Sequence, residues 1–127
     1  MGGAGVSFPA IPAALTESPL AESIQTQLRK GILELCVLTL LSRGDAYGYE
    51  IATRLMQEVG MGEGTIYPLM RRMQDDELVS TYLVEAPSSP PRKYYRMTEQ
   101  GKKTLAAQRA EWKTFMGAVE KMLGDDA

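Results

Sequence analysis

Residues 60–73 read Gly-Met-Gly-Glu-Gly-Thr-Ile-Tyr-Pro-Leu-Met-Arg-Arg-Met, and this stretch decides the fold. Three glycines in its first five positions favour a tight turn over a helix interior. Apolar residues then recur at helix spacing and predict a helix over about residues 65–76, with these four on its inner side: Ile66, Leu69, Met70 and Met73. Pro68 is expected in the first turn, where its missing N–H costs little. The stretch therefore predicts a tight turn that leads into an amphipathic helix.

The outer side of this helix is predicted to carry Thr65, Tyr67, Arg71 and Arg72. Thr65 and Tyr67 lie near its N-terminus, where they could donate to phosphates or touch bases, although Tyr67 could instead be a partly buried core aromatic. Because Arg71 and Arg72 are adjacent, at most one can face a groove squarely. The other could pair with an aspartate three or four residues later.

Two further helices are predicted upstream. Apolar spacing indicates one over about residues 22–41, ended by Gly44. Asp45 is predicted to cap the next helix, over about residues 46–59. The predicted inner face of that helix is Ile51, Leu55, Met56 and Val59.

A β-hairpin is predicted downstream. Residues 78–85 are rich in β-branched and aromatic side chains, residues 86–91 in Pro and Ser, and residues 93–97 suit a returning strand. The expected result is a hairpin with a long tip that bears Arg92 and Lys93. These cations suit phosphate contacts that weaken with salt, and the alternative is a solvated pair of loop charges.

A long last helix should follow, capped by Thr98 and running to about Leu123. Its apolar residues repeat at intervals of seven and form a heptad-like stripe, in two sets: Leu105, Trp112 and Val119, and Phe115 and Met122. A stripe of this kind is typical of a helix that packs against another helix.

Composition narrows the possible functions. The 127 residues suffice for one domain with a small core, which oligomerisation often supplements. The chain has no His and a single Cys, Cys36, which we expect to be a buried small hydrophobe in a reducing cytoplasm. The glycine-rich turn lacks the Lys of a phosphate-binding loop, and without His no nucleophile has an evident activating base. We therefore expect no enzyme, cofactor or metal site.

Charge argues weakly against a nucleic-acid partner. The net charge is −2, whereas DNA-binding domains are usually basic. Residues 43–103 contain nine basic and nine acidic residues, so the outcome depends on whether the basic groups share one surface. We expect residues 1–20 to be a flexible tail or an arm. The first basic residue is Arg29, so no signal peptide is expected, and the longest apolar run, residues 32–41, is half the length of a membrane span.

The order helix, helix, turn, helix and hairpin is the winged helix-turn-helix plan, so we expect a mainly α fold with a small β-hairpin. The chain also resembles the PadR family of transcriptional regulators, in its branch with one C-terminal helix. The resemblance rests on residues 28–35 (Leu-Arg-Lys-Gly-Ile-Leu-Glu-Leu), 47–51 (Tyr-Gly-Tyr-Glu-Ile), 62–73 and 91–101 (Pro-Arg-Lys-Tyr-Tyr-Arg-Met-Thr-Glu-Gln-Gly). It covers roughly residues 25–123 and does not reach residues 1–20.

The resemblance implies a dimeric regulator, in most cases a repressor, that binds double-stranded operator DNA. It implies that Thr65, Tyr67 and Arg71 or Arg72 read the major groove, that Arg92 and Lys93 contact DNA from the wing, and that Tyr47 lies near the backbone. It also implies that the last helix dimerises through its stripe. The expected organisation is a tail (1–20), a winged-helix domain (21–98) and a dimerisation helix (99–127).

Trp112 carries a further implication. In multidrug-binding relatives an aromatic at this place stacks on planar ligands, and a Trp offers a large flat face for stacking. A small planar or aromatic effector at the dimer interface is therefore expected to release the protein from DNA, although a Trp that only packs is the plainer alternative. Two other functions stay open: a winged-helix protein-interaction module that has lost DNA binding, and a drug-sequestering binder with no operator.

Overall fold

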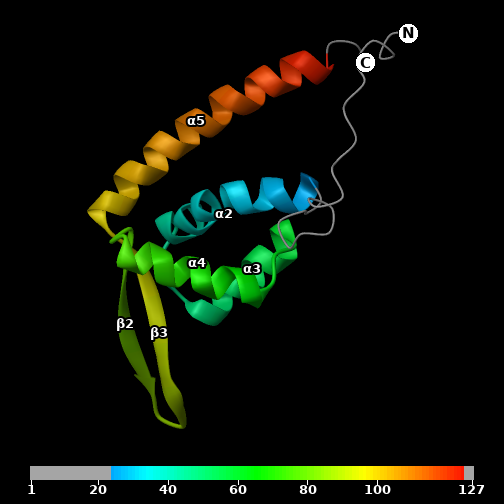
Figure 1. Ribbon diagram of the computed structural model, residues 1–127. Coiled ribbons are helices and arrows are strands. Elements are labelled where there is room, and N and C mark those ends of the chain that lie inside the picture. Colours follow the sequence, from blue (N-terminus) through cyan, green and yellow to red (C-terminus); the bar gives the residue numbers. More distant parts are fainter. Residues whose placement is uncertain (1–23, 125–127) are drawn as a thin grey trace. The chain divides into compact units, whose positions relative to one another are not determined.

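The computed structural model describes residues 24–124, with side chains from residue 32, and the expected tail at residues 1–20 lies outside that range. Its helices are α2 (Ile24–Ser42), α3 (Gly48–Val59), α4 (Glu63–Asp75) and α5 (Glu99–Gly124) (Figure 1). Its strands are β1 (Ala46–Tyr47), β2 (Val79–Ala86) and β3 (Ser89–Met97), which form one antiparallel sheet in the order β1-β3-β2. The predicted fold class, mainly α with a small hairpin in a winged helix-turn-helix arrangement, is confirmed.

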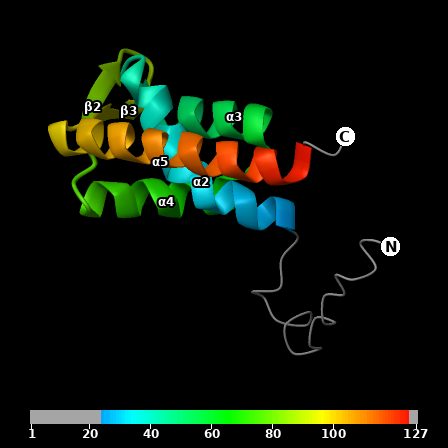
Figure 2. The ribbon, with the colours of Figure 1, turned by 90° about the horizontal axis from the view of Figure 1, so that it is seen from above.

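A single apolar core holds together the compact unit that begins at Ile32. Within this unit α2 lies between α5 and the pair formed by α3 and α4 (Figures 1 and 2). The largest fully buried side chains come from these three inner helices: Leu33, Val37, Leu38, Ile51, Ile66, Met70 and Met73. The predicted inner stripe of α4 is confirmed, because all four of its apolar residues are buried.

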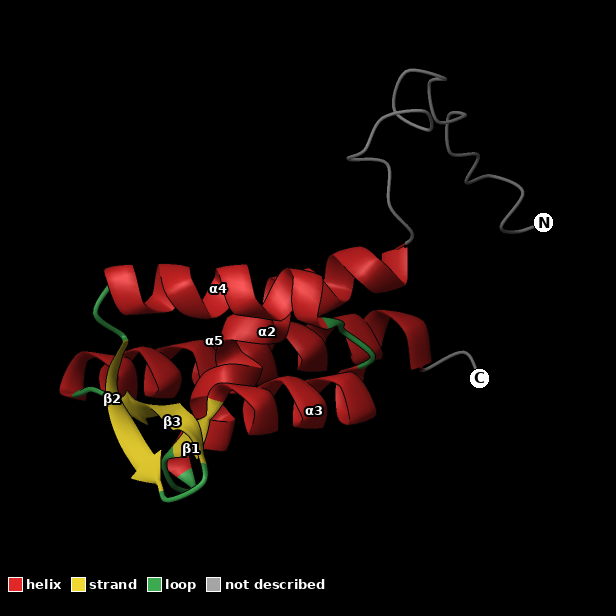
Figure 3. Ribbon diagram, turned by 90° about the horizontal axis from the view of Figure 1, so that it is seen from below, coloured by secondary structure: helices red, strands yellow, loops and turns green. Residues whose placement is uncertain are grey.

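The start of α3 differs from the prediction. Ala46 and Tyr47 are not helical but form β1, pairing with Tyr95 and Tyr94 of β3 (Figure 3). Asp45 therefore does not cap the helix. Glu50 instead accepts a hydrogen bond from the backbone N–H of Tyr47 at 3.0 Å, from three residues inside the helix. The extended backbone before α3 gains sheet hydrogen bonds that an earlier helix start would have forfeited.

The buried face of α3 also needs one correction. Ile51 and Leu55 are buried and Val59 is half-buried, as predicted. Met56 is 50% exposed, and Ala52 takes its place in the core at 2% exposure. Ala52 lies one turn before Met56 on nearly the same side of α3, so the buried face includes a small residue that periodicity weighted by side-chain size does not detect.

The prediction of a long hairpin tip is wrong. Residues 87 and 88 alone form the turn, and β3 already begins at Ser89. The register runs from Val84↔Arg92 to Ala86↔Ser89, so Pro90 and Pro91 together oppose the single residue Glu85 in a bulge. β3 tolerates these prolines because β1 covers it only at Tyr94 and Tyr95, which leaves its outer edge free near the tip.

The helix α4 begins at Glu63, two residues before the predicted start. Pro68 therefore lies in the second turn and not in the first. Its missing N–H leaves the carbonyl of Gly64 without a helical partner. Gly64 is exposed, so water can supply that hydrogen bond and the helix continues unbroken to Asp75.

The predicted cap of α5 is confirmed. The Thr98 hydroxyl accepts a hydrogen bond from the backbone N–H of Gly101 at 2.9 Å and donates to the carbonyl of Glu77 at 2.7 Å. The cap thus ties the last helix to the residues that follow α4. No helix within residues 24–124 is long and apolar enough to cross a membrane.

Candidate nucleic-acid interface

The register of the sheet sends Arg92 and Lys93 to opposite faces. Side chains alternate along a strand, so Arg92 shares its face with Tyr94, and Lys93 shares the other face with Tyr95. Tyr95 is only 7% exposed and belongs to the core, so Lys93 points to the side on which the helices pack. The two cations therefore lie on opposite faces of the wing, which is the hairpin of β2 and β3. They do not form the pair of adjacent loop charges that the sequence predicted.

Each cation lies over an aromatic ring. The guanidinium of Arg92 is 4.8 Å from the ring centroid of Tyr47, and the ammonium of Lys93 is 5.5 Å from that of Tyr95. Contacts of this geometry attract a cation through the ring quadrupole. They hold both side chains back toward the body of the domain instead of leaving them free at the tip.

A hollow of about 380 Å³ forms where β1, the start of α3, the helix α4 and the strand β3 meet. It is lined by residues from all four elements: Tyr47, Gly48, Tyr49, Tyr67, Arg71, Arg92, Lys93 and Tyr95. Five of the seven residues predicted to contact DNA thus lie around one site. Of the other two, Thr65 is half-buried and Arg72 is exposed, and both lie outside the lining.

The charge of this hollow is positive. Arg71, Arg92 and Lys93 line it, and no carboxylate is among its lining residues within the described part of the chain. Although the net charge of residues 43–103 is zero, these three basic side chains thus form one local positive surface, which is the arrangement that attracts a polyanion. This arrangement argues against the alternative function, an interaction module that has lost DNA binding.

Two tyrosines of the hollow are held in the neutral form. Burial is the main cause that raises the pKa of Tyr67, and Glu63 adds to it. Burial also raises the pKa of Tyr95, against a smaller opposing effect of Arg71. At neutral pH both hydroxyls therefore remain available as hydrogen-bond donors.

Gly48 and Tyr49 also line the hollow and were not predicted. Gly48 leaves room for a neighbour, because a Cβ there would lie 3.3 Å from Cε1 of Tyr67. The Tyr-Gly-Tyr motif at residues 47–49 is the signal that could have identified both residues. Tyr95 could have been identified only from its register in β3.

Asp45 binds both strands of the wing, β2 and β3. Its carboxylate accepts hydrogen bonds from the Tyr82 hydroxyl at 2.6 Å and from Nε of Arg96 at 3.1 Å. The first of these is the main cause that raises the pKa of Tyr82. Since Asp45 immediately precedes β1, this contact fixes the wing relative to Tyr47 at the edge of the hollow.

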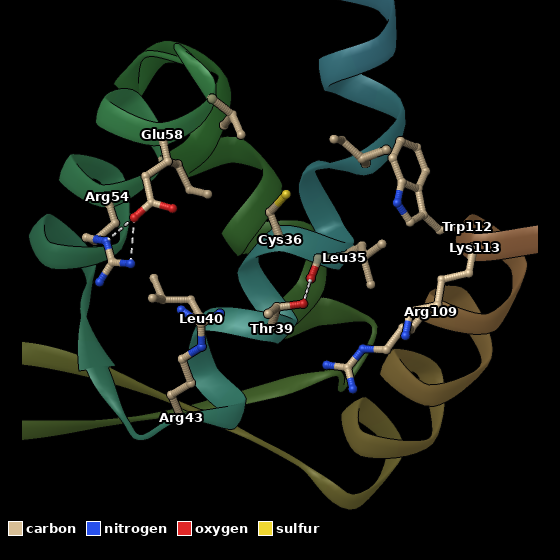
Figure 4. Close-up of a pocket in the computed structure, with 13 residues that line it drawn as sticks. Leu35, Cys36, Thr39, Leu40, Arg43, Arg54, Glu58, Arg109, Trp112 and Lys113 are labelled. Carbon is tan, nitrogen blue, oxygen red and sulfur yellow. Dashed lines mark hydrogen bonds and ion pairs between the residues drawn. The ribbon is translucent and has the colours of Figure 1, made fainter. Parts of the chain in front are cut away.

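A second cavity, of about 450 Å³, lies between α2, α3 and α5 (Figure 4). Trp112 lines it from α5 and is half-buried, with Arg109 and Lys113 beside it. On the α3 side, Arg54 and Glu58 form an ion pair at 2.6 Å. The cavity therefore combines an apolar interior with charged walls.

Cys36 borders this cavity and is half-buried, so its expected full burial is wrong. The open space beside α5 leaves its thiol partly uncovered. Burial is still the main cause that raises the pKa of the thiol, followed by the charge of Glu58. The thiol thus stays protonated at neutral pH and acts as an apolar side chain.

The stripe on α5 is covered only at its start. Leu105 is buried, Trp112 and Val119 are half-buried, and Phe115 and Met122 are 62% and 80% exposed. Large apolar side chains thus remain uncovered along the second half of the helix. Exposed apolar surface of this kind is typical of an interaction site.

Comparison with known proteins decides the family. The "Transcriptional regulator PadR-like family" matches residues 37–107, which include α3, α4 and the whole wing. The chain belongs to the PadR-like family. This PadR-like protein is therefore a transcriptional regulator and not an enzyme.

Solved structures agree with this assignment. A PadR-like transcriptional regulator from Bacillus cereus is 36% identical with a TM-score of 0.70, and the match covers 77% of this chain and 97% of that one. A PadR-like transcription factor from Bacteroides fragilis is 37% identical with a TM-score of 0.65, covering 80% and 99%. An uncharacterised protein of Lysinibacillus sphaericus is 29% identical over 70% of this chain and 85% of its own length.

One similar structure contains DNA. Bacillus subtilis PadR in complex with operator DNA is 25% identical to this chain with a TM-score of 0.56. The match covers 61% of this chain but 46% of the Bacillus subtilis protein, which is longer.

Proposed function

We propose that this PadR-like protein binds operator DNA as a homodimer and represses a nearby promoter. The observation that carries the proposal is the basic hollow, in which Arg71 of α4 meets Arg92 and Lys93 of the wing. The operator complex of the related Bacillus subtilis PadR supports it. Such a function would place the protein in the cytoplasm, with the chromosome.

In this proposal α4 enters the major groove. Thr65 and Tyr67 lie in its N-terminal half and Arg71 one turn further on, so they contact base edges or the flanking phosphates. Arg71 rather than Arg72 is the principal reader, because it faces the hollow and Arg72 does not. Tyr47 carries Arg92 on its ring and holds it close to the DNA backbone.

The homodimer is proposed to form through the apolar stripe of α5. We assign DNA binding to residues 21–98 and dimerisation to residues 99–127. A two-fold dimer would set its two α4 helices about 34 Å apart, one turn of DNA, on a pseudo-palindromic site.

Selection of bound duplexes from a random pool tests this function. The full chain should enrich one sequence with two inverted half-sites centred about ten base pairs apart. An enriched single half-site would contradict the dimer. Failure to enrich any sequence would contradict operator binding.

The salt dependence of binding tests the wing. Arg92→Ala should weaken binding to every duplex and reduce the slope of log K against log salt by about one unit, because one phosphate contact is lost. Fluorescence anisotropy at several salt concentrations measures that slope, and Arg43→Ala, an arginine outside the hollow, serves as control. An unchanged slope would show that Arg92 does not contact phosphate.

A small planar or aromatic effector is proposed to release the DNA. The half-buried indole of Trp112, beside the cavity under α5, offers it a stacking face. An effector changes DNA affinity only if it binds more tightly to one conformation of the dimer than to another. In this proposal the two conformations differ in the distance between the two winged-helix domains.

The Trp112 variant tests the effector site. Trp112→Ala should weaken binding of the aromatic dye 8-anilinonaphthalene-1-sulfonate by roughly tenfold, since one stacked aromatic contact contributes about 0.5–1.5 kcal/mol beyond the area it buries. Dye fluorescence measures the affinity. Thr114→Ala is the control, because Thr114 is exposed on the same helix and neither lines the cavity nor belongs to the apolar stripe. Equal affinities of Trp112→Ala and the unaltered protein would refute stacking.

A further inference from the structure

Leu83 is a large apolar residue of the wing that is not packed in the core. Along β2, the odd-numbered residues point to the side on which α4 packs. Val79 is 3% exposed and lies in the core, and Thr81 accepts a hydrogen bond from Nε2 of Gln74 in α4 at 3.3 Å. Leu83 is the next residue on this face, and it is 67% exposed. It therefore lies on the α4 side of the wing, beyond the end of the core.

The cross-strand partner of Leu83 is Lys93. Residues directly opposite each other in an antiparallel pair share a face, so the two side chains are neighbours. Lys93 belongs to the basic hollow together with Arg71. An uncovered leucine thus lies directly beside Lys93 at the edge of the basic surface.

We infer that Leu83 makes the wing selective: it packs in the minor groove beside the segment read by α4 and disfavours base pairs with a guanine 2-amino group. This inference rests on the proposed operator binding. Positive charge at Lys93 and Arg71 favours DNA as the partner of this face. Leu83 lies two residues nearer to the tip of the wing than Thr81, the residue of this face that contacts α4, and this places Leu83 past the major groove that α4 enters and toward the adjacent minor groove.

The chemistry of the minor groove explains the selectivity. A·T pairs present only acceptors there, whereas G·C pairs add the guanine N2 amino donor. An aliphatic side chain cannot accept a hydrogen bond from that donor, and covering it would leave it unsatisfied. Apolar side chains are among those that proteins place against the minor groove. Leu83 therefore contributes discrimination without contributing charge.

Base analogues isolate this contact. Replacing adenine by 2,6-diaminopurine adds the minor-groove amino group while leaving the major-groove pattern of an A·T pair unchanged. Each A·T pair outside the major-groove segment of the selected operator is replaced in turn, and binding is measured with the full chain. The unaltered protein should lose about tenfold in affinity at one or two positions in each half-site.

The variants assign the loss to one side chain. Leu83→Ala should reduce the diaminopurine penalty to less than about twofold and leave the salt slope unchanged, since no charge is removed. Val84→Ala is the matched control, because Val84 is also exposed but lies on the opposite face, paired with Arg92. Circular dichroism checks that both variants fold.

Three results would overturn the inference. A full diaminopurine penalty in Leu83→Ala, or no penalty at any position for an unaltered protein that binds its operator tightly, would refute it and leave operator binding intact. A change in oligomeric state of Leu83→Ala in sedimentation equilibrium would identify a second copy as the partner of this face. Absence of any selected operator would contradict both the inference and the proposed function.

Discussion

Arg71→Ala should abolish most of the preference for operator over scrambled DNA, lowering operator affinity by roughly ten- to a hundredfold. This is the loss expected when a side chain that reads a base edge is removed. Arg71 is the residue of α4 that lies both on the exposed side of the helix and against the basic wing. Affinities for the two duplexes at one fixed salt concentration give the measurement.

Arg72→Ala is the control for this prediction. Arg72 has the same side chain one position later and is also exposed, but it does not line the hollow. Its removal should weaken binding to both duplexes alike, because it contributes only a general positive charge. A larger loss of preference in Arg72→Ala than in Arg71→Ala would show that the other side of α4 faces the bases.

Gly101→Ala should lower the free energy of unfolding by about 1–3 kcal/mol, the usual cost of forcing extra volume into a packed site. A Cβ at this position would lie 2.2 Å from the carbonyl oxygen of Leu78. That oxygen already accepts a hydrogen bond from the backbone N–H of Thr98 at 3.1 Å. The contact joins α5 to the segment between α4 and β2, so neither side can move away without losing the cap of α5.

Gly117→Ala is the control, since Gly117 lies on the same helix and a Cβ there would meet nothing within 4 Å. It should raise stability by up to about 1 kcal/mol, the difference in helix propensity between Ala and Gly. Urea unfolding of both variants at one protomer concentration provides the comparison, because the stability of a dimer depends on concentration. Equal stability of the two variants would contradict the tight contact at Gly101.

The helices of the fold could be predicted because their periodic apolar residues carry the signal. The stripe of α4 and the Thr98 cap depend on neighbours within one or two turns, so local sequence determines them. The start of α3 and the extent of β3 could not be predicted. The start of α3 depends on the pairing of Ala46 with Tyr95, residues far apart in the sequence, and the extent of β3 depends on its pairing with β2 near the tip.

The candidate site shows the same limit. The sequence identified Tyr67, Arg71, Arg92 and Lys93 as candidates, and the fold brings them together. It could not decide between Arg71 and Arg72, because that choice depends on how α4 is turned toward the wing. It also could not separate Arg92 from Lys93, because their opposite directions follow from the strand register. The role of Leu83 depends on the same register.

The most direct test of operator binding is fluorescence anisotropy of the full chain with its selected operator and with a scrambled duplex, at two salt concentrations. We predict that the operator binds at least about a thousandfold more tightly and that both affinities fall as salt increases. Equal and weak binding to the two duplexes would contradict the central claim that the basic hollow beside α4 recognises a specific DNA site.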